Sequence, residues 1–188
     1  KHYFPSQIFS SILGGGMSSK LFQEIRENKG LCYSVYSFAW SYIDTGLVGV
    51  YAGTSQNHVK DLIPSVIEEI QKMTNNISEE DIDRAKAQLK ASIIMSQENT
   101  SSRCENAARQ LIIHKRTVPN SEIMSKIDSV DKKAVPNCPA APSPAVEDKI
   151  NKLLSLNSTT PSSTKNFSFS LSFLTSIKPG RKNVTKGI

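Results

Sequence analysis

The chain has 188 residues, of which 38% are hydrophobic, and a formal net charge of +6. This length suffices for one domain with a hydrophobic core, while the modest apolar content indicates that part of the chain is unstructured. No run of about 20 apolar residues occurs and the first residues lack the order of a signal peptide, so we expect a soluble cytoplasmic protein without a membrane span.

Most of the positive charge lies in the C-terminal part of the sequence. Residues 136–188 contain seven Lys or Arg and two acidic residues, whereas residues 1–135 carry a net charge of only +1. A nucleic-acid-binding domain concentrates basic groups on one face of its folded part, and this distribution does not indicate such a face. We therefore interpret the charge as a solvated tail and expect no nucleic-acid partner.

A short helix followed by a glycine segment is predicted at the start of the chain. Apolar residues recur there at helical spacing, at Ile8, Phe9, Ile12 and Leu13. Gly14, Gly15 and Gly16 end this helix, because three glycines leave the backbone too free to remain helical. The segment lacks the order of a phosphate-binding loop. A helix start after glycines can attract an anion, but we interpret the segment as a flexible connector.

A second helix is predicted directly after the glycines. Its apolar stripe consists of Leu21, Phe22 and Ile25. Ser18 or Ser19 can cap its start, and a basic residue followed by glycine, at residues 29–30, is typical of its end.

Two strands are predicted next, joined by a hairpin turn at residues 43–46. Residues 31–42 alternate with the period of a strand, and residues 47–52 form the partner. One of the two alternating sets is rich in aromatic residues and consists of Cys32, Tyr36, Phe38, Trp40 and Tyr42. The other contains Tyr33, Val35, Ser37 and Ala39.

The rest of the chain up to residue 130 has helical periodicity. Apolar residues recur at helical spacing in four segments, at residues 59–73, 82–94, 104–112 and 123–130. Pro64 is expected to kink an early turn of the first of these helices unless that helix begins near it. Ser78 and Ser121 are suitable N-caps. Strands followed by several helices predict an α+β fold, with an antiparallel sheet and helices on one face.

The composition changes abruptly after Val135. Six of the nine prolines lie at or beyond residue 136, where a helix cannot continue. We expect an incomplete domain at residues 1–135 and a Pro/Ser-rich basic tail at residues 136–188, mostly disordered and either unrelated to the domain or frame-shifted. Within the tail, residues 149–156 could form a short helix, and residues 167–174 alternate as a strand does.

No catalytic or metal-binding motif is visible. His2, His58 and His114 are far apart and form neither an H-x-x-E-H nor an H-E-x-x-H pattern, so we interpret them as surface residues. The cysteines at positions 32, 104 and 138 form no C-x-x-C pair, and we interpret them as packing residues. The sequence therefore predicts no catalytic residue and no metal ligand in this chain.

The segment from Leu13 to Phe38, LGGGMSSKLFQEIRENKGLCYSVYSF, is the most informative part of the chain. It resembles the C-terminal domain of inverted-zincin metallopeptidases of the insulinase and processing-peptidase type. Among these it is most similar to bacterial relatives of the mitochondrial processing peptidase β subunit. The likeness continues through residues 44–47, 51–54 and 84–90 and covers about residues 1–135.

This resemblance implies a role in a zinc metalloendopeptidase. In that family the other half holds zinc through H-x-x-E-H, so the resemblance places the zinc in a partner half or homologous subunit and leaves this chain without a cofactor. It also implies that Arg26 and Tyr33, seven positions apart, bind the peptide substrate. A guanidinium can donate to peptide carbonyls and a phenol can donate to a developing oxyanion.

Other interpretations of the same residues remain open. From residue type alone, Arg26 could pair with Glu24 or Glu27 on the surface while Tyr33 packs in the sheet. The chain could also be a non-catalytic scaffold, such as a core subunit of a larger assembly, or the inactive product of a gene fragment.

Overall fold

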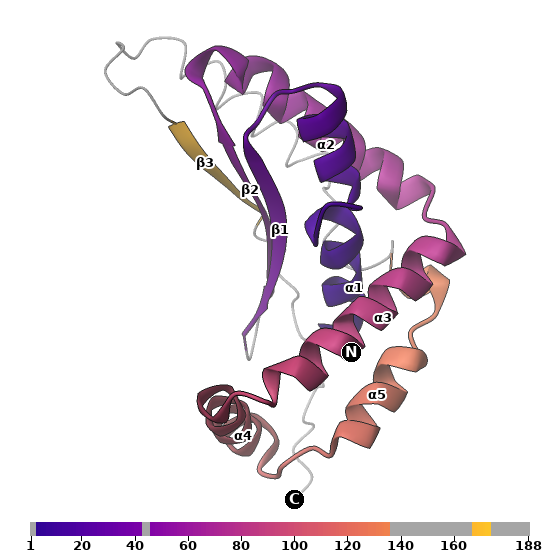
Figure 1. The fold of residues 1–188 in the computed structure, drawn as a ribbon. Coiled ribbons are helices and arrows are strands. Elements are labelled where there is room, and N and C mark those ends of the chain that lie inside the picture. The colour runs from indigo at the N-terminus through magenta and orange to yellow at the C-terminus, as the bar shows by residue number, and fades with distance from the viewer. Residues whose placement is uncertain (1–2, 43–45, 136–166, 174–188) are drawn as a thin grey trace, which may run out of the picture.

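The computed structural model describes residues 3–42, 46–135 and 167–173 of the chain. Its helices α1 (Tyr3–Gly14) and α2 (Val59–Asn75) lie on one face of an antiparallel sheet, which confirms the α+β class (Figure 1). The sheet order is β1-β2-β3, with β1 at Ser34–Ser41, β2 at Gly46–Thr54 and β3 at Phe167–Phe173. None of the helices in these ranges is long and apolar enough to cross a membrane.

The two faces of the β1–β2 pair differ in residue size. The face toward the helices carries small and aliphatic side chains, and Val35, Val48, Val50 and Ala52 on it are all at most 8% exposed. The aromatic set of β1 alternates with these residues and lies on the opposite face, where Tyr36 and Trp40 are about half exposed. The predicted alternation is confirmed within β1, where the aromatic side is directed away from the helices. It does not extend to the residues before the strand, because Cys32 of the aromatic set is buried and Tyr33 of the other set is 76% exposed.

Helix α1 packs directly against β1. Gly14 makes this close approach possible, because a Cβ atom at that position would lie 2.4 Å from the backbone nitrogen of Ser37. Hydrogen bonds also join the layers: the Ser37 hydroxyl donates to the Ser10 carbonyl at 2.6 Å, the Ser10 and Ser37 hydroxyls lie 3.1 Å apart, and Gln7 Nε2 donates to the Ala39 carbonyl at 2.9 Å. Eight of the twelve residues of α1 are buried as a result.

Helices α2 and α3 (Glu79–Ser96) extend the core. The buried stripe of α2 includes Leu62, Ile63, Val66, Ile67, Ile70 and Met73. Pro64 lies inside α2, which begins at Val59, so the helix includes the proline rather than starting at it. Ser78 caps α3 as predicted, since its hydroxyl accepts a hydrogen bond from the Asp81 backbone nitrogen at 3.1 Å. Only the first turns of α3 are buried.

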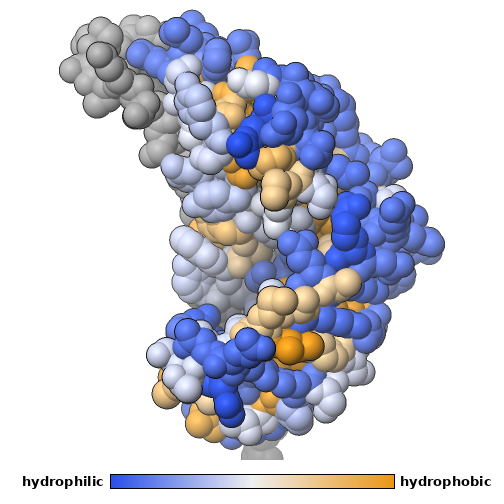
Figure 2. Space-filling model, in the orientation of Figure 1, coloured by the Kyte–Doolittle hydropathy of each residue, from blue (hydrophilic) through white to orange (hydrophobic). Residues whose placement is uncertain are grey.

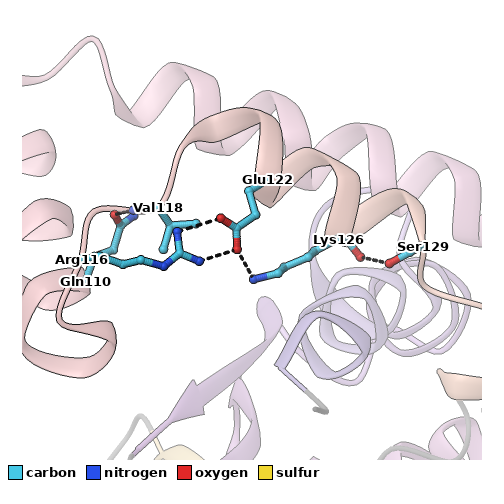
Figure 3. Close-up of polar contacts among 6 residues, drawn as sticks. All are labelled: Gln110, Arg116, Val118, Glu122, Lys126 and Ser129. Atoms are coloured by element: carbon cyan, nitrogen blue, oxygen red, sulfur yellow. Dashed lines mark hydrogen bonds and ion pairs between the residues drawn. The ribbon is translucent and has the colours of Figure 1, made fainter.

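Helices α4 (Thr100–His114) and α5 (Asn120–Asp128) lie at the lower end of the molecule in Figure 1, away from the sheet. Polar contacts organise the turn between them (Figure 3). Arg116 donates two hydrogen bonds to Glu122, at 2.9 and 2.8 Å, and Lys126 donates a third at 2.8 Å. These partners lower the pKa of Glu122 to about 2, the Arg116 hydrogen bond being the largest cause. The expected Ser121 cap is wrong, because α5 begins at Asn120 after Pro119, which provides no side-chain cap.

Three short helical segments complete the described chain. A π-helix spans Phe22–Asn28, and 3-10 helices span Gln56–His58 and Lys132–Ala134. Val135, where the change in composition occurs, is fully buried.

The structure tests some of the expectations for the tail and the cysteines. Residues 167–173 form a strand, as their alternation predicts. The short helix expected at residues 149–156 lies outside the described residues. Cys32 is buried, but Cys104 is exposed and therefore is not a packing residue. Cys138 also lies outside the described residues.

Candidate functional site

The glycine segment is held by hydrogen bonds on both of its sides. The Gly15 backbone nitrogen donates to the Ser11 carbonyl at 2.9 Å, and Gln88 Nε2 of α3 donates to the Gly15 carbonyl at 3.0 Å. The Ser19 hydroxyl donates to the Gly16 carbonyl at 2.6 Å. Ser19 thus stabilises the glycine turn and does not act as the expected N-cap acceptor. The segment is a fixed connection between α1 and the next helix, where we expected a flexible one.

The helix after the glycines is wound as a π-helix. Its C-terminal end shows the wider winding, because the Lys29 backbone nitrogen donates to the Glu24 carbonyl, five residues earlier, at 3.1 Å. Leu21 and Ile25 are fully buried and anchor this helix in the core. Gly30 follows in the left-handed conformation with φ of 61°, so the glycine end predicted for this helix is confirmed.

Arg26 lies on this π-helix with 41% of its side chain exposed. Its guanidinium carbon is 4.5 Å from the centroid of the Phe22 ring, and its Nε atom is 3.8 Å from Glu27 Oε1. Glu24 is occupied elsewhere, since it accepts a hydrogen bond from Asn28 at 2.8 Å. Of the two acidic partners considered for Arg26, the structure therefore selects Glu27.

Tyr33 lies just before β1, and its side chain does not pack into the sheet. The backbone nitrogen donates to the Gly53 carbonyl of β2 at 2.8 Å, while the residue is 76% exposed. Within the described part of the chain, no hydrogen bond or ring contact involves its phenol. The phenol is therefore accessible, in contrast to the alternative in which it is buried in the sheet.

Cys32 links the surroundings of Arg26 and Tyr33. Burial raises the pKa of the Cys32 thiol, and the positive charge of Arg26 acts on it in the opposite direction. No hydrogen bond or ion pair between described residues joins the side chains of Arg26 and Tyr33 themselves.

The described ranges contain no group of three His, Cys, Asp or Glu side chains that could hold a metal ion. His58 and His114 are exposed, as expected for surface residues, and His2 lies outside the described residues.

The sequence did not reveal that aromatic rings cover the outer face of the sheet next to Tyr33. The rings of Tyr36 and Tyr51 stack across the strands with centroids 4.9 Å apart, and those of Phe38 and Trp40 are 4.7 Å apart. The β1–β2 register sets this arrangement by placing Tyr36 opposite Tyr51. The alternation of aromatic residues was the available signal, but it does not tell which face is left open to solvent.

The fold and the sequence comparisons define the class of this protein as a peptidase inactive domain. Residues 1–89 match the family model of the peptidase M16 inactive domain. An uncharacterized zinc protease of Rickettsia felis is 37% identical over 127 residues, which cover 68% of this chain and 31% of that protein. The β subunit of the rat mitochondrial-processing peptidase is also 37% identical, over 65% of this chain and 25% of that subunit. Residues 1–89 of the chain therefore belong to the peptidase M16 inactive-domain family.

Solved structures support the same fold. A conserved protein from Enterococcus faecalis has a TM-score of 0.62 at 23% identity, covering 73% of this chain and 32% of that one. An M16 inactive domain from Pseudomonas fluorescens has a TM-score of 0.58 at 20% identity, covering 73% of this chain and 33% of its own. The present chain spans less than a third of the length of the zinc protease and the processing-peptidase subunit that it matches.

Proposed function

We propose that this domain is the peptide-binding half of a zinc metalloendopeptidase of the processing-peptidase type, and that it acts with a second half that carries the zinc. One observation carries the proposal: two side chains suited to peptide recognition, Arg26 and Tyr33, are exposed and make no hydrogen bonds to other described residues. Family membership and the zinc-protease names of the relatives support the same function.

The chemistry of the two side chains fits an extended peptide. A guanidinium has five N–H donors and no acceptor, so it can donate to successive peptide carbonyls. The ion pair of Arg26 with Glu27, at 3.8 Å, is too long to be a hydrogen bond and leaves these donors free. The Tyr33 hydroxyl can donate to the oxygen of a carbonyl under attack, where negative charge develops. The proposal assigns water activation and the metal to the partner half.

The proposal also separates the domain from the tail at about residue 135. Val135 is fully buried and lies where the composition changes, and the relatives align over stretches of 124 to 127 residues. We infer that residues 136–188 have a different origin from the peptidase domain, although residues 167–173 add strand β3 to its sheet beside β2.

A reconstitution assay tests the proposed function. The full chain is mixed with an H-x-x-E-H-bearing half from the same cell, zinc and a basic extended peptide, and cleavage is followed by mass spectrometry. Losing one charged donor to substrate costs about 1.5–3 kcal/mol, so we expect Arg26→Ala to lower kcat/KM by roughly 10- to 100-fold. Arg109→Ala is the matched control, because Arg109 is an exposed arginine of α4 that pairs with Glu105.

Two outcomes would reject the proposal. One is that the chain adds nothing to the cleavage seen with the zinc-bearing half alone. The other is that Arg26→Ala and Arg109→Ala behave alike, a result that would favour a non-catalytic scaffold.

A further inference from the structure

Arg26 and Phe22 lie four residues apart on the π-helix, and their side chains contact each other. Phe22 is half-buried and packs against the hydrophobic core, so one side of its ring is anchored in the domain. The guanidinium carbon of Arg26 lies 4.5 Å from the centroid of this ring. An arginine within about 6 Å of a ring centroid is attracted by the negative face of the ring.

The other contact of Arg26 cannot hold the guanidinium in place equally well. The ion pair with Glu27 is 3.8 Å long and joins side chains that are 41% and 52% exposed. An exposed pair of this kind contributes little and is screened by salt. The Phe22 ring, fixed on its buried side, is therefore the main constraint on the position of Arg26.

A ring contact also leaves the guanidinium chemically available. The donors of a guanidinium lie in its plane, so an aromatic ring below that plane does not consume them. A carboxylate partner at hydrogen-bond distance would occupy the donors instead. The contact with Phe22 thus combines a restricted position with free N–H groups, which is what binding of peptide carbonyls requires.

The winding of the helix is a second sign that this segment is specialised. Phe22–Asn28 is a π-helix of seven residues, a rare conformation that is frequent at functional sites. Phe22 and Arg26, whose side chains contact each other, both lie on this π-helix.

We propose that Phe22 is a positioning residue of the peptide site, whose ring holds the Arg26 guanidinium ready to receive peptide carbonyls. This inference rests on the proposed function, because it assigns to Phe22 a role that is exerted through Arg26.

A double-mutant cycle on the full chain tests the inference. The probe is a fluorescein-labelled basic peptide of about 15 residues in extended form, and binding is measured by fluorescence anisotropy. We expect Arg26→Gln to weaken binding about tenfold and Phe22→Leu to weaken it about two- to fivefold. Phe22→Tyr should restore affinity because it retains the ring. The variant with both F22L and R26Q should bind like R26Q alone, because residues acting as one unit are not additive.

Phe38→Leu is the matched control for loss of a ring, since Phe38 is an aromatic residue of the sheet that contacts other rings and, among the described residues, no cation. A spectroscopic measurement separates positioning from packing. The Arg26 Nε–Hε resonance should show a ring-current shift that disappears in F22L and persists in F22Y.

The possible results distinguish the inference from the function on which it rests. If R26Q weakens binding but the two changes are additive, or if F22Y fails to restore affinity, the inference is overturned and the proposed function stands. If R26Q leaves affinity unchanged, the proposed function fails and the role of Phe22 fails with it.

Discussion

Helices α1 and α4 are similar in length and opposite in environment. Eight of the twelve residues of α1 are buried, whereas none of the fifteen residues of α4 is. The difference does not follow from a lack of apolar residues in α4, because Leu111, Ile112 and Ile113 are each at least 50% exposed. Figure 2 shows hydrophobic atoms at the lower end of the molecule, where α4 lies. Position relative to the sheet therefore matters together with apolar content, since α1 contains no charged residue whereas α4 contains Arg103, Glu105 and Arg109.

We expect the largest change in the free energy of unfolding from a substitution of Phe9, which lies in α1. Phe9 is completely buried, so Phe9→Ala removes a large side chain from a packed environment and leaves a cavity. We expect the free energy of unfolding to fall by about 3–5 kcal/mol. Urea denaturation followed by circular dichroism measures the change, and a loss below about 1 kcal/mol would show that α1 is not the centre of the core.

Local pattern predicts α1 well and α4 only in part. The spacing of Ile8, Phe9, Ile12 and Leu13 identifies both the helix and its buried face, and these residues are at most 3% exposed. The same reasoning predicts α4 correctly as a helix. It cannot predict that α4 has no buried residue among those the structure describes. Periodicity tells which residues share a face of a helix, but it does not tell whether another element packs against that face.

A smaller loss is expected where α1 meets the sheet. Gly14→Ala introduces a Cβ atom 2.4 Å from the backbone nitrogen of Ser37, so α1 and β1 must move apart. Overpacking of this kind costs about 1–3 kcal/mol. Gly16→Ala is the control, since the nearest atom to its added Cβ is the end of the Gln88 side chain at 3.7 Å. Equal midpoints for both variants would contradict the close packing of α1 on β1.

For the candidate site, too, the sequence predicts some features and misses others. The seven-residue spacing of Arg26 and Tyr33 can be read from the sequence, and the structure shows both side chains exposed. The contact of Arg26 with Phe22 and the π-helical winding depend on side-chain packing, which the spacing of residues does not specify. The pairing of β3 with β2 joins segments more than 100 residues apart, and a local pattern contains no information about such a pairing.

A substitution of Asp81 should have an intermediate effect on the free energy of unfolding, and this effect should depend on pH. Asp81 lies in α3 and forms an ion pair with Lys20, which lies just before the π-helix. Burial acts to raise the pKa of the Asp81 carboxyl, but the hydrogen bonds from Lys20, Ser78 and Arg84, with the charge of Lys20, lower it below its ordinary value. A lowered pKa in the folded state adds stability at pH values above the unfolded pKa of about 3.9. This contribution is lost as the pH falls through the lowered folded value.

Asp81→Asn should therefore destabilise the protein by about 1–3 kcal/mol at pH 7. The difference in the free energy of unfolding between the Asp81→Asn variant and the wild-type protein should shrink below about pH 4. Urea denaturation at pH 7, 5 and 3 measures both quantities. A difference that stays constant across these three values would show that the charge of Asp81 is not responsible.

We expect the smallest change in the free energy of unfolding from a substitution in α4, in contrast to the large change expected in α1. Leu111→Ser replaces an apolar side chain that is 50% exposed on a helix without buried residues. The substitution therefore removes little buried apolar surface from the folded protein. We expect the free energy of unfolding to change by no more than about 0.5 kcal/mol. Urea denaturation measures this value at two protein concentrations about 50-fold apart, since association through α4 would make the midpoint depend on concentration. A loss as large as that of Phe9→Ala, independent of concentration, would show that α4 belongs to the core and that the contrast with α1 is wrong.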